Sequence, residues 1–168
     1  ICMWLLKNPM SYEVLVAPNL YGDVISDLAA QMVGGLGFGC SGNIGAKLAV
    51  FEPSHGSAPK YAGQYKVNPL ATILAAKMML DWLGEKEKGA RVEQATAAVI
   101  AEGKVRTYDM GGKATTLEMA QAIGEELLFV FGLRAEAVAI QIPQMLGQAY
   151  LFKRYCQDPK GAGGNPAW

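Results

Sequence analysis

The first third of the chain changes from a short apolar run to a helical repeat, and this change predicts its elements. Residues 12–16 form a short, largely apolar run that is typical of a buried strand. Pro18 and Gly22 favour a tight turn after it. From Asp23 onward, apolar residues recur at helical spacing, which predicts a helix that Asp23 opens, with Val24, Ile25, Leu28 and Met32 as its apolar positions.

Start and stop signals place the remaining elements. Asn68 and Pro69 are a favourable helix start, Gly84 and Gly103 are stop signals, and Thr115 to Glu118 has the spacing of a capping box. We therefore expect helices over residues 1–6, 69–83, 88–102 and 116–128, strands over 48–52 and 104–107, a glycine-rich connection over 34–45 and a loop over 108–112.

Asp23 and Asp27 are four residues apart, so they project from one face of the predicted helix. Two carboxylates held this close repel each other unless a cation, a shared proton or a shared positive partner lies between them. A hard divalent ion such as Mg²⁺ or Mn²⁺ takes such oxygen ligands. The alternative interpretation is that both are helix-start aspartates favoured by the helix dipole.

Two glycine-containing stretches are candidates for ligand binding. Residues 37–42 match G-x-G-x-x-G, but a helix precedes them and a strand follows, so we reject a dinucleotide-binding turn of the Rossmann type. Residues 52–63 combine small residues, the cation of Lys60 and the flat hydroxylated ring of Tyr61, which suits a phosphate-bearing ligand. His55 in this stretch fits either a catalytic or a structural hydrogen-bonding role.

Composition limits the class of protein. The 168 residues are enough for one domain, and 51% of them are hydrophobic, which provides a substantial core. The net charge of zero argues against a nucleic-acid or anionic-membrane partner, and no apolar run has the length of a membrane span. Three scattered cysteines fit a reducing compartment without structural zinc, so we expect a cytoplasmic protein, or one of the mitochondrial matrix if eukaryotic.

A series of motifs then identifies a family. They occur in family order and cover about residues 1–128: Asn19-Leu20-Tyr21-Gly22-Asp23-x₃-Asp27, Val33-Gly34-Gly35-Leu36-Gly37, Asn43-Ile44-Gly45, Phe51-Glu52, His55-Gly56-Ser57-Ala58-Pro59 and Asn68-Pro69. This series closely resembles the isocitrate/3-isopropylmalate dehydrogenases, which are metal-dependent, β-decarboxylating oxidoreductases.

The resemblance implies an α/β fold that is not a Rossmann fold. Family members have a large α/β domain and a smaller domain, with the active site in the cleft between them, and a homodimer completes that site. We expect residues 1–38 to be part of the smaller domain, 39–131 to be the C-terminal part of the large domain, and 132–168 to be an atypical tail, helical over 136–155 and disordered at its end, 158–168. The chain resembles the C-terminal half of a family member. The catalytic base, the catalytic tyrosine, the substrate-binding arginines and a further metal ligand are therefore expected upstream of Ile1, and no catalytic residue is assigned here.

The resemblance also implies roles for individual residues. Asp23 and Asp27 match the metal ligands and Glu52 a position near the nicotinamide ribose. The positions that match contacts to the adenosine and the phosphates are His55, Gly56, Ser57, Ala58, Asn68 and Asp109. Lys60, Tyr61 and Tyr108 resemble the NADP-type pattern, although Gly112 stands where some bacterial NADP-type members carry an arginine.

These matches predict an NADP-dependent isocitrate dehydrogenase that uses Mg²⁺ or Mn²⁺, acts on a small 2-hydroxy acid and forms a homodimer. One alternative keeps the class and changes the substrate to 3-isopropylmalate, homoisocitrate or tartrate, with NAD as coenzyme. A second alternative is a non-catalytic regulatory paralogue that binds a nucleotide, and the two acids that remain argue against it. We expect the 168-residue polypeptide by itself to be inactive.

Overall fold

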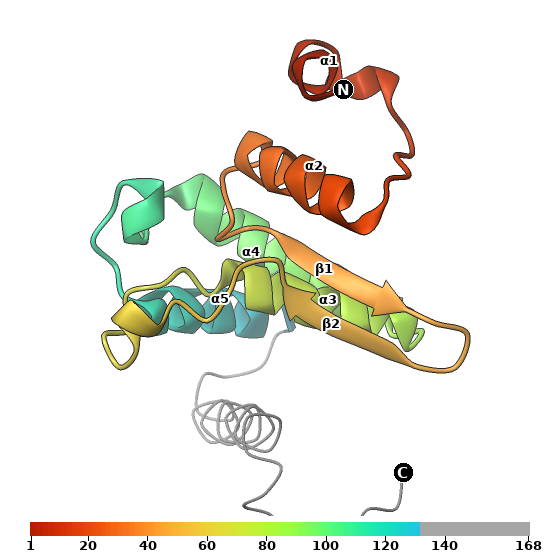
Figure 1. Cartoon of the computed structure of the whole chain (residues 1–168). Helices are drawn as coiled ribbons and strands as arrows, with labels where there is room; N and C mark the ends of the chain where they lie inside the picture. Colours follow the sequence, from red (N-terminus) through yellow and green to blue (C-terminus); the bar gives the residue numbers. More distant parts are fainter. Residues whose placement is uncertain (132–168) are drawn as a thin grey trace, which may run out of the picture. The chain divides into compact units, whose positions relative to one another are not determined.

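The computed structural model describes residues 1–131, of which residues 1–127 form one compact unit (Figure 1). The elements in chain order are α1 (Cys2–Lys7), α2 (Asn19–Met32), β1 (Cys40–Ile44), β2 (Ala49–Pro53), α3 (Leu70–Trp82), α4 (Lys86–Glu102) and α5 (Thr116–Phe131). Short 3₁₀ turns lie at Pro9–Ser11, Pro59–Tyr61 and Tyr108–Met110. The tail predicted over 132–168, with its helix and its disordered end, lies outside the described residues.

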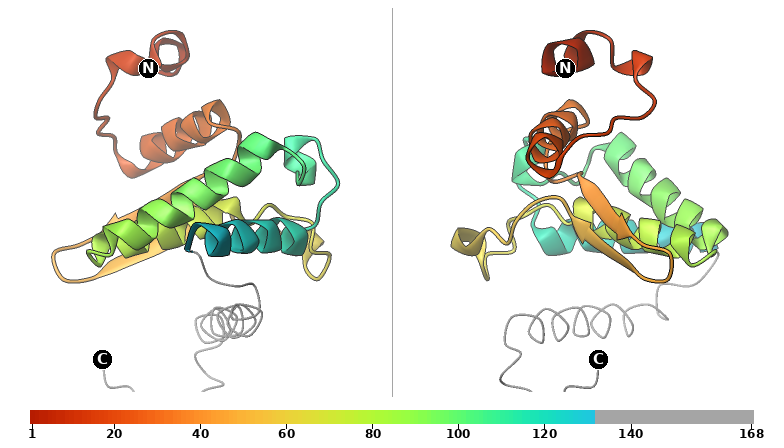
Figure 2. Two further views of the ribbon diagram at one scale, coloured as in Figure 1. Left: turned by 180° about the vertical axis from the view of Figure 1, so that it is seen from behind. Right: turned by 45° about the vertical axis from the view of Figure 1, so that its right-hand side comes forward.

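Strands β1 and β2 form an antiparallel hairpin in which Gly42 pairs with Phe51. The side chains of β2 alternate between half-buried and exposed, as expected for a strand with one covered face. Helix α3 covers that face and α4 packs along α3 (Figures 1 and 2). The Phe51 and Trp82 rings meet at a centroid distance of 6.3 Å, which joins the hairpin to the C-terminal end of α3.

The core lies where α3, α4 and α5 meet. Its buried members are Leu70, Ala95, Val99, Met119 and Ile123. Small alanines on α3 and α4 let the helices approach closely, and the larger Leu70 and Met119 side chains fill the space that remains. Lys77 of α3 connects the helices at the surface, because its ammonium group lies 2.9 Å from Glu93 of α4 and 3.0 Å from Asp81.

The predicted helix ends agree with the structure. Gly84 and Gly103 follow α3 and α4 with φ angles of 85° and 67°, which glycine adopts without strain. The Asn68 Oδ1 atom accepts a hydrogen bond from the Leu70 N–H at 3.0 Å, as a capping side chain does, but α3 begins at Leu70 with Pro69 at its N-cap, so the predicted start is one residue early. The capping box is also confirmed, since the Glu118 N–H donates to Thr115 Oγ1 at 3.2 Å and Glu118 Oε2 accepts from the Thr115 N–H at 2.7 Å.

Three local predictions are wrong. Residues 12–16 are not a strand: within residues 1–131 the hairpin is the one sheet, and no strand pairs with this run, which leaves Val14 80% and Val16 94% exposed. Residues 104–107 likewise pair with no strand among the described residues. Residues 40–44 were predicted to belong to an irregular glycine-rich connection, but they form strand β1. Their glycine and polar side chains carry little strand signal in the sequence, and the strand forms because β2 supplies its hydrogen-bond partners.

The start of α2 also differs from the prediction. The helix begins at Asn19, four residues before Asp23, and the Gly22 N–H already donates to the Pro18 carbonyl at 2.8 Å. Pro18 therefore precedes the first helical residue, and Gly22 is a helical residue rather than a turn residue. The rejection of a Rossmann turn at residues 37–42 is confirmed, since α2 precedes this segment and the segment runs into β1.

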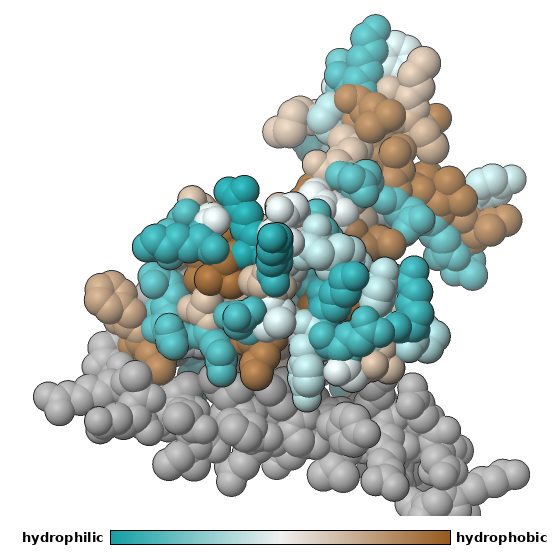
Figure 3. Space-filling model, turned by 90° about the vertical axis from the view of Figure 1, so that its left-hand side faces the viewer, coloured by the Kyte–Doolittle hydropathy of each residue, from teal (hydrophilic) through white to brown (hydrophobic). Residues whose placement is uncertain are grey.

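Much of the apolar surface of residues 1–36 is exposed. Figure 3 shows hydrophobic atoms gathered on the upper part of the molecule, which carries α1 and α2. The exposed side chains there include Met3, Trp4, Leu6, Met10, Val14, Val16, Leu20, Tyr21 and Val24. No helix in residues 1–131 is both long enough and apolar enough to cross a membrane.

Candidate functional site

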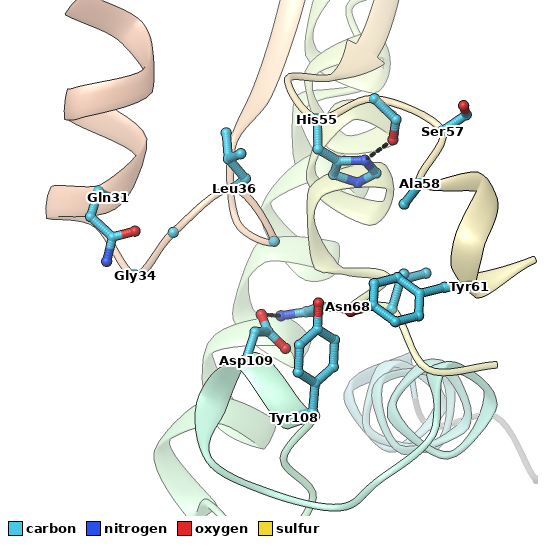
Figure 4. Close-up of a pocket in the computed structure, with 14 residues that line it drawn as sticks. Gln31, Gly34, Leu36, His55, Ser57, Ala58, Tyr61, Asn68, Tyr108 and Asp109 are labelled. Carbon is cyan, nitrogen blue, oxygen red and sulfur yellow. Dashed lines mark hydrogen bonds between the residues drawn. The ribbon is translucent and has the colours of Figure 1, made fainter. Parts of the chain in front are cut away.

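A cavity of about 540 Å³ lies among loops of the described part (Figure 4). The end of α2 and the glycine-rich segment after it form one side, and the loop that follows β2 forms another. Of the residues predicted to bind the cofactor, His55, Gly56, Ser57, Ala58, Tyr61, Asn68, Tyr108 and Asp109 all line this cavity. We call it the loop cavity.

The floor of the loop cavity is a hydrogen-bonded pair, Asn68 and Asp109. The Asn68 amide donates to Asp109 Oδ2 at 2.9 Å (Figure 4). The Thr107 hydroxyl donates to Asp109 Oδ1 at 2.5 Å. A Cβ atom at Gly37 would lie 2.5 Å from Asp109 Oδ2, so a glycine is needed for the chain to pass this closely. The Gly37 carbonyl accepts from the Ala71 N–H at 2.8 Å, which fixes the glycine-rich segment to the start of α3.

His55 and Ala58 shape the opposite wall. The Nδ1 atom of His55 lies 2.8 Å from the Gly56 carbonyl oxygen, which can only accept, so Nδ1 carries the proton. Nε2 is then an acceptor in the neutral ring. Ala58 has a φ of 43°, a left-handed conformation that turns the chain into the Pro59–Tyr61 turn. The absence of a side chain at Gly56 leaves the backbone open, with no atom within 4 Å of a Cβ built there.

Two tyrosines form the remaining edge, and the ammonium groups of two lysines lie against their rings. The Tyr61 and Tyr108 rings are tilted by 49° at a centroid distance of 6.0 Å (Figure 4). Lys60 does not line the cavity, and its ammonium group lies 4.8 Å from the Tyr61 ring centroid. Lys66, which the sequence analysis did not single out, lies 5.2 Å from both ring centroids. The signal that would have found it is a second lysine six residues after Lys60 in the same loop.

A second cavity, of about 340 Å³, contains both predicted metal ligands. Asp23 and Asp27 line it together with Val24, Ser26, Leu36 and Ser54. Because Leu36 also lines the loop cavity, the two cavities are neighbours. Since α2 begins at Asn19, neither acid lies in its first turn, which weakens the interpretation that the helix dipole explains both. We call this space the aspartate cavity.

The donor set of the aspartate cavity fits a hard divalent cation in part. Two carboxylates on one helix face supply oxygen ligands of the kind that Mg²⁺ and Mn²⁺ prefer. Residues 1–131 contain no group of three or more histidine, cysteine, aspartate or glutamate side chains that could hold a metal ion. A cation held here would complete its coordination with water, substrate or groups from elsewhere.

Glu52 lies outside both cavities. It is exposed on β2, and its Oε1 accepts a hydrogen bond from the Asn43 amide of β1 at 3.3 Å. A role near the nicotinamide ribose therefore stays a prediction for this residue.

Comparison with known proteins decides the family. The profile described as isocitrate/isopropylmalate dehydrogenase matches residues 1–125, which is most of the chain. The chain belongs to this family. The resemblance drawn from the motifs is confirmed, and so is the α/β dehydrogenase fold of this family.

Individual relatives of this dehydrogenase family agree. The chain is 54% identical over 125 residues to an isocitrate/homoisocitrate dehydrogenase of Thermus thermophilus, covering 74% of this chain and 37% of that protein. It is 46% identical over 125 residues to a 3-isopropylmalate dehydrogenase of Methanothermobacter thermautotrophicus, covering 74% of this chain and 38% of that protein. It is 50% identical over 115 residues to a probable NAD isocitrate dehydrogenase subunit alpha of Caenorhabditis elegans, covering 68% and 32%. The chain thus spans about a third of the length of these relatives.

A solved structure gives the same result. The crystal structure of isocitrate dehydrogenase from Methylococcus capsulatus superposes with a TM-score of 0.71 at 42% identity, covering 75% of this chain and 38% of that one. A β-decarboxylating dehydrogenase from Thermococcus kodakarensis superposes with a TM-score of 0.71 at 37% identity, covering 78% and 39%.

Proposed function

We propose that this chain is part of a metal-dependent dehydrogenase that converts isocitrate and NADP⁺ to 2-oxoglutarate, CO₂ and NADPH. The observation that carries the proposal is the pair of neighbouring cavities, in which two carboxylates of α2 face one space and the nucleotide-type loop faces the other. A hydroxy acid bound between them would present its hydroxyl carbon to the coenzyme while its oxygens lie near the carboxylates.

Asp23 and Asp27 are the residues that would hold the cation. When bound, a divalent ion acidifies the substrate hydroxyl and stabilises the charge that decarboxylation leaves behind. The acids themselves attract the cation and fix its position on a rigid helix. The described residues supply no group to which we assign the proton-transfer step.

The loop cavity would take the nucleotide. Gly56 would allow the phosphates to approach the backbone, and the hydrogen bond between Asn68 and Asp109 would hold both side chains in place to bind the adenine. Tyr61 and Tyr108 offer flat faces and hydroxyls at the edge of the cavity. His55 would present its ring to the ligand, with Nδ1–H donating to the Gly56 carbonyl.

NADP is the coenzyme that the tyrosine edge favours. The 2′-phosphate distinguishes NADP from NAD, and a phosphate binds best where cations and hydroxyls converge. The ammonium group of Lys60 lies against the Tyr61 ring, and the tyrosines add hydroxyls. NAD is the alternative, and some relatives carry NAD in their names.

The domain assignment of the sequence analysis is part of this proposal. Residues 1–38, with the two acids, belong to the smaller domain, and residues 39–131 belong to the large one. We further propose a homodimer that shares its active site, because exposed apolar surface on α1 and α2 is available for burial.

The substrate is the least constrained part, since relatives are named for isocitrate, homoisocitrate and 3-isopropylmalate. The test is a panel of isocitrate, homoisocitrate, 3-isopropylmalate and tartrate, each assayed in the complete protein with NADP⁺ and NAD⁺ in the presence of Mn²⁺. The proposal predicts the highest kcat/KM for isocitrate with NADP⁺. Highest activity on another acid would show that this acid, and not isocitrate, is the substrate. Coenzyme binding without turnover on any acid would instead support a regulatory paralogue.

A further inference from the structure

A third cavity, of about 330 Å³, lies on the tyrosine edge and is not explained by the assignments above. Its lining consists of Gln64, Tyr65, Lys66, Tyr108, Gly112, Lys113, Ala114 and Thr115. Tyr108 lines both this space and the loop cavity, so a ligand in the loop cavity can extend past that ring. The lining contains two lysines and no acid, which suits an anionic group. We call it the lysine cavity.

The position of Lys66 is fixed from several sides. Its ammonium group lies 5.2 Å from the centroids of both Tyr61 and Tyr108, within the range of a cation–π interaction. The neighbouring Tyr65 adopts a left-handed φ of 49°, and its carbonyl accepts from the Thr116 N–H at 2.7 Å. These contacts anchor the Lys66 backbone to the start of α5, so the cation is held near the edge of the loop cavity.

The backbone at Gly112 limits which residues can place a cation on this wall. A Cβ atom at this position would lie 2.0 Å from the Arg106 carbonyl oxygen, so the backbone leaves no room for any side chain. The Gly112 N–H donates to the Thr107 carbonyl at 2.9 Å, which holds the loop in this course. A cation on this wall must therefore come from the next residue, Lys113, or from Lys66 across the cavity.

Two acids lie close to this region in sequence, and both are already hydrogen-bonded. Asp109 does not line the lysine cavity, and it accepts hydrogen bonds from the Asn68 amide and the Thr107 hydroxyl. Glu118 does not line it either, and its Oε2 accepts from the Thr115 N–H at 2.7 Å and from the Thr115 hydroxyl at 2.8 Å. Both carboxylates thus have partners other than the two lysines.

We propose that Lys66, assisted by Lys113, binds the 2′-phosphate of a nucleotide whose adenosine occupies the loop cavity. This inference rests on the proposed function, since it requires a nucleotide there. Lys66 is then a residue that determines specificity for NADP over NAD. A side chain at position 112 could not take this role, because the backbone at Gly112 leaves no room for one.

The test measures binding of two adenosine probes by calorimetry in the complete protein. Adenosine 2′,5′-bisphosphate carries the extra phosphate, and adenosine 5′-monophosphate lacks it. The Lys66→Met variant keeps most of the apolar stem and removes the charge. We expect it to weaken the bisphosphate by about tenfold, with a smaller loss for Lys113→Met, because a charge-assisted contact is lost. Affinity for the monophosphate should not change.

Two further variants serve as controls. Lys86→Met removes an exposed lysine at the start of α4 that lines none of the three cavities, and it should leave both affinities unchanged. Lys66→Arg retains the cation and should restore most of the bisphosphate affinity. Recovery with arginine shows that charge, rather than misfolding, explains the loss.

Other outcomes overturn the inference in distinguishable ways. If the bisphosphate binds and Lys66→Met behaves like Lys86→Met, the role of Lys66 is wrong while the proposed function stands. If neither probe binds the unaltered protein, the proposed coenzyme site fails and this inference fails with it. If inorganic phosphate binds as tightly as the bisphosphate and depends on Lys66, the lysine cavity is a free-anion site and the coenzyme assignment is wrong.

Discussion

Tyr61 is the residue around which the cations of the nucleotide site gather. Its ring contacts the ammonium groups of Lys60 and Lys66, and its other neighbour is the Tyr108 ring. An aromatic face attracts a cation without supplying a counter-charge, so these ring contacts do not replace the anion that the two ammonium groups can bind. Single side chains at this edge therefore decide the charge that the coenzyme meets.

Replacement of Lys60 by aspartate should shift the coenzyme preference from NADP toward NAD. An acid repels the 2′-phosphate and can accept a hydrogen bond from a free 2′-hydroxyl. One partly exposed charge-assisted contact corresponds to a change of roughly 10- to 150-fold. The measurement is the ratio of kcat/KM for NADP⁺ to that for NAD⁺ in both forms, with Lys60→Gln separating loss of the cation from gain of the acid. An unchanged ratio, or a preference for NAD in the unaltered enzyme, would show that Lys60 does not read the phosphate.

The sequence indicated most of the residues of the loop cavity, since the family motifs name them and the structure brings them together. It did not indicate Lys66, because this lysine lies outside those motifs and acquires its position only when residues 61 and 108 meet in space. The restriction at Gly112 was also invisible, since it depends on the course of the Arg106 backbone.

At the scale of elements, local signals predicted several helix ends correctly because both partners there lie close in sequence, although they placed the start of α2 four residues late. The capping box of α5 and the glycine ends of α3 and α4 are examples, and each agrees with the structure. Strand predictions failed because a strand needs a partner: β1 has one despite its weak signal, whereas residues 12–16 have none among the residues described. Hydrophobicity alone cannot supply that information.

The capping box gives α5 a pH-dependent contribution to stability. Hydrogen bonds from the Thr115 N–H and hydroxyl hold the pKa of Glu118 below its ordinary value. Because the pKa of Glu118 is lower in the folded protein than in the unfolded one, its carboxylate stabilises the fold at pH values above the unfolded pKa of about 4.3. This stabilisation is lost as the pH falls below that value and through the lower folded-state pKa. Between pH 6 and 3, the free energy of unfolding should therefore decline more in the unaltered protein than in Glu118→Gln.

Denaturant unfolding at several pH values measures this difference. Thr115→Ala should cost about 1 kcal/mol at neutral pH, because it removes the hydroxyl of the cap. Parallel pH profiles for the unaltered protein and Glu118→Gln would contradict the assignment of the carboxylate to the cap.

At the scale of the whole molecule, the core and the exposed surface are unevenly distributed. The buried cluster joins α3, α4 and α5, whereas α1 and α2 expose many of their large apolar side chains. Apolar surface of this extent drives association in water. The sequence showed a sufficient supply of hydrophobic residues but not which of them the fold would leave uncovered.

The 168-residue polypeptide alone should self-associate and should show no dehydrogenase activity. Association follows from the exposed apolar face, and inactivity follows because Asp23 and Asp27 are its only predicted metal ligands and no proton-transfer group is assigned. Light scattering after size-exclusion chromatography measures the self-association. Replacing the exposed Val14 and Val16 by serine should reduce the apparent mass. Monomeric behaviour, or metal-dependent NADPH formation by this polypeptide, would contradict the expectation.

The central claim is that Asp23 and Asp27 hold a catalytic divalent ion, and a Mn²⁺ titration of activity in the complete enzyme tests it most directly. Steady-state NADPH formation from isocitrate is measured in the unaltered enzyme and in Asp27→Asn, with Asp81→Asn as the control, because Asp81 lies outside all three cavities and pairs with Lys77. We expect Asp27→Asn to lower activity at least 100-fold, roughly the upper range for disturbance of a metal site, and to require more Mn²⁺. The control should match the unaltered enzyme. Near-normal turnover by Asp27→Asn, with an unchanged Mn²⁺ requirement, would contradict the account.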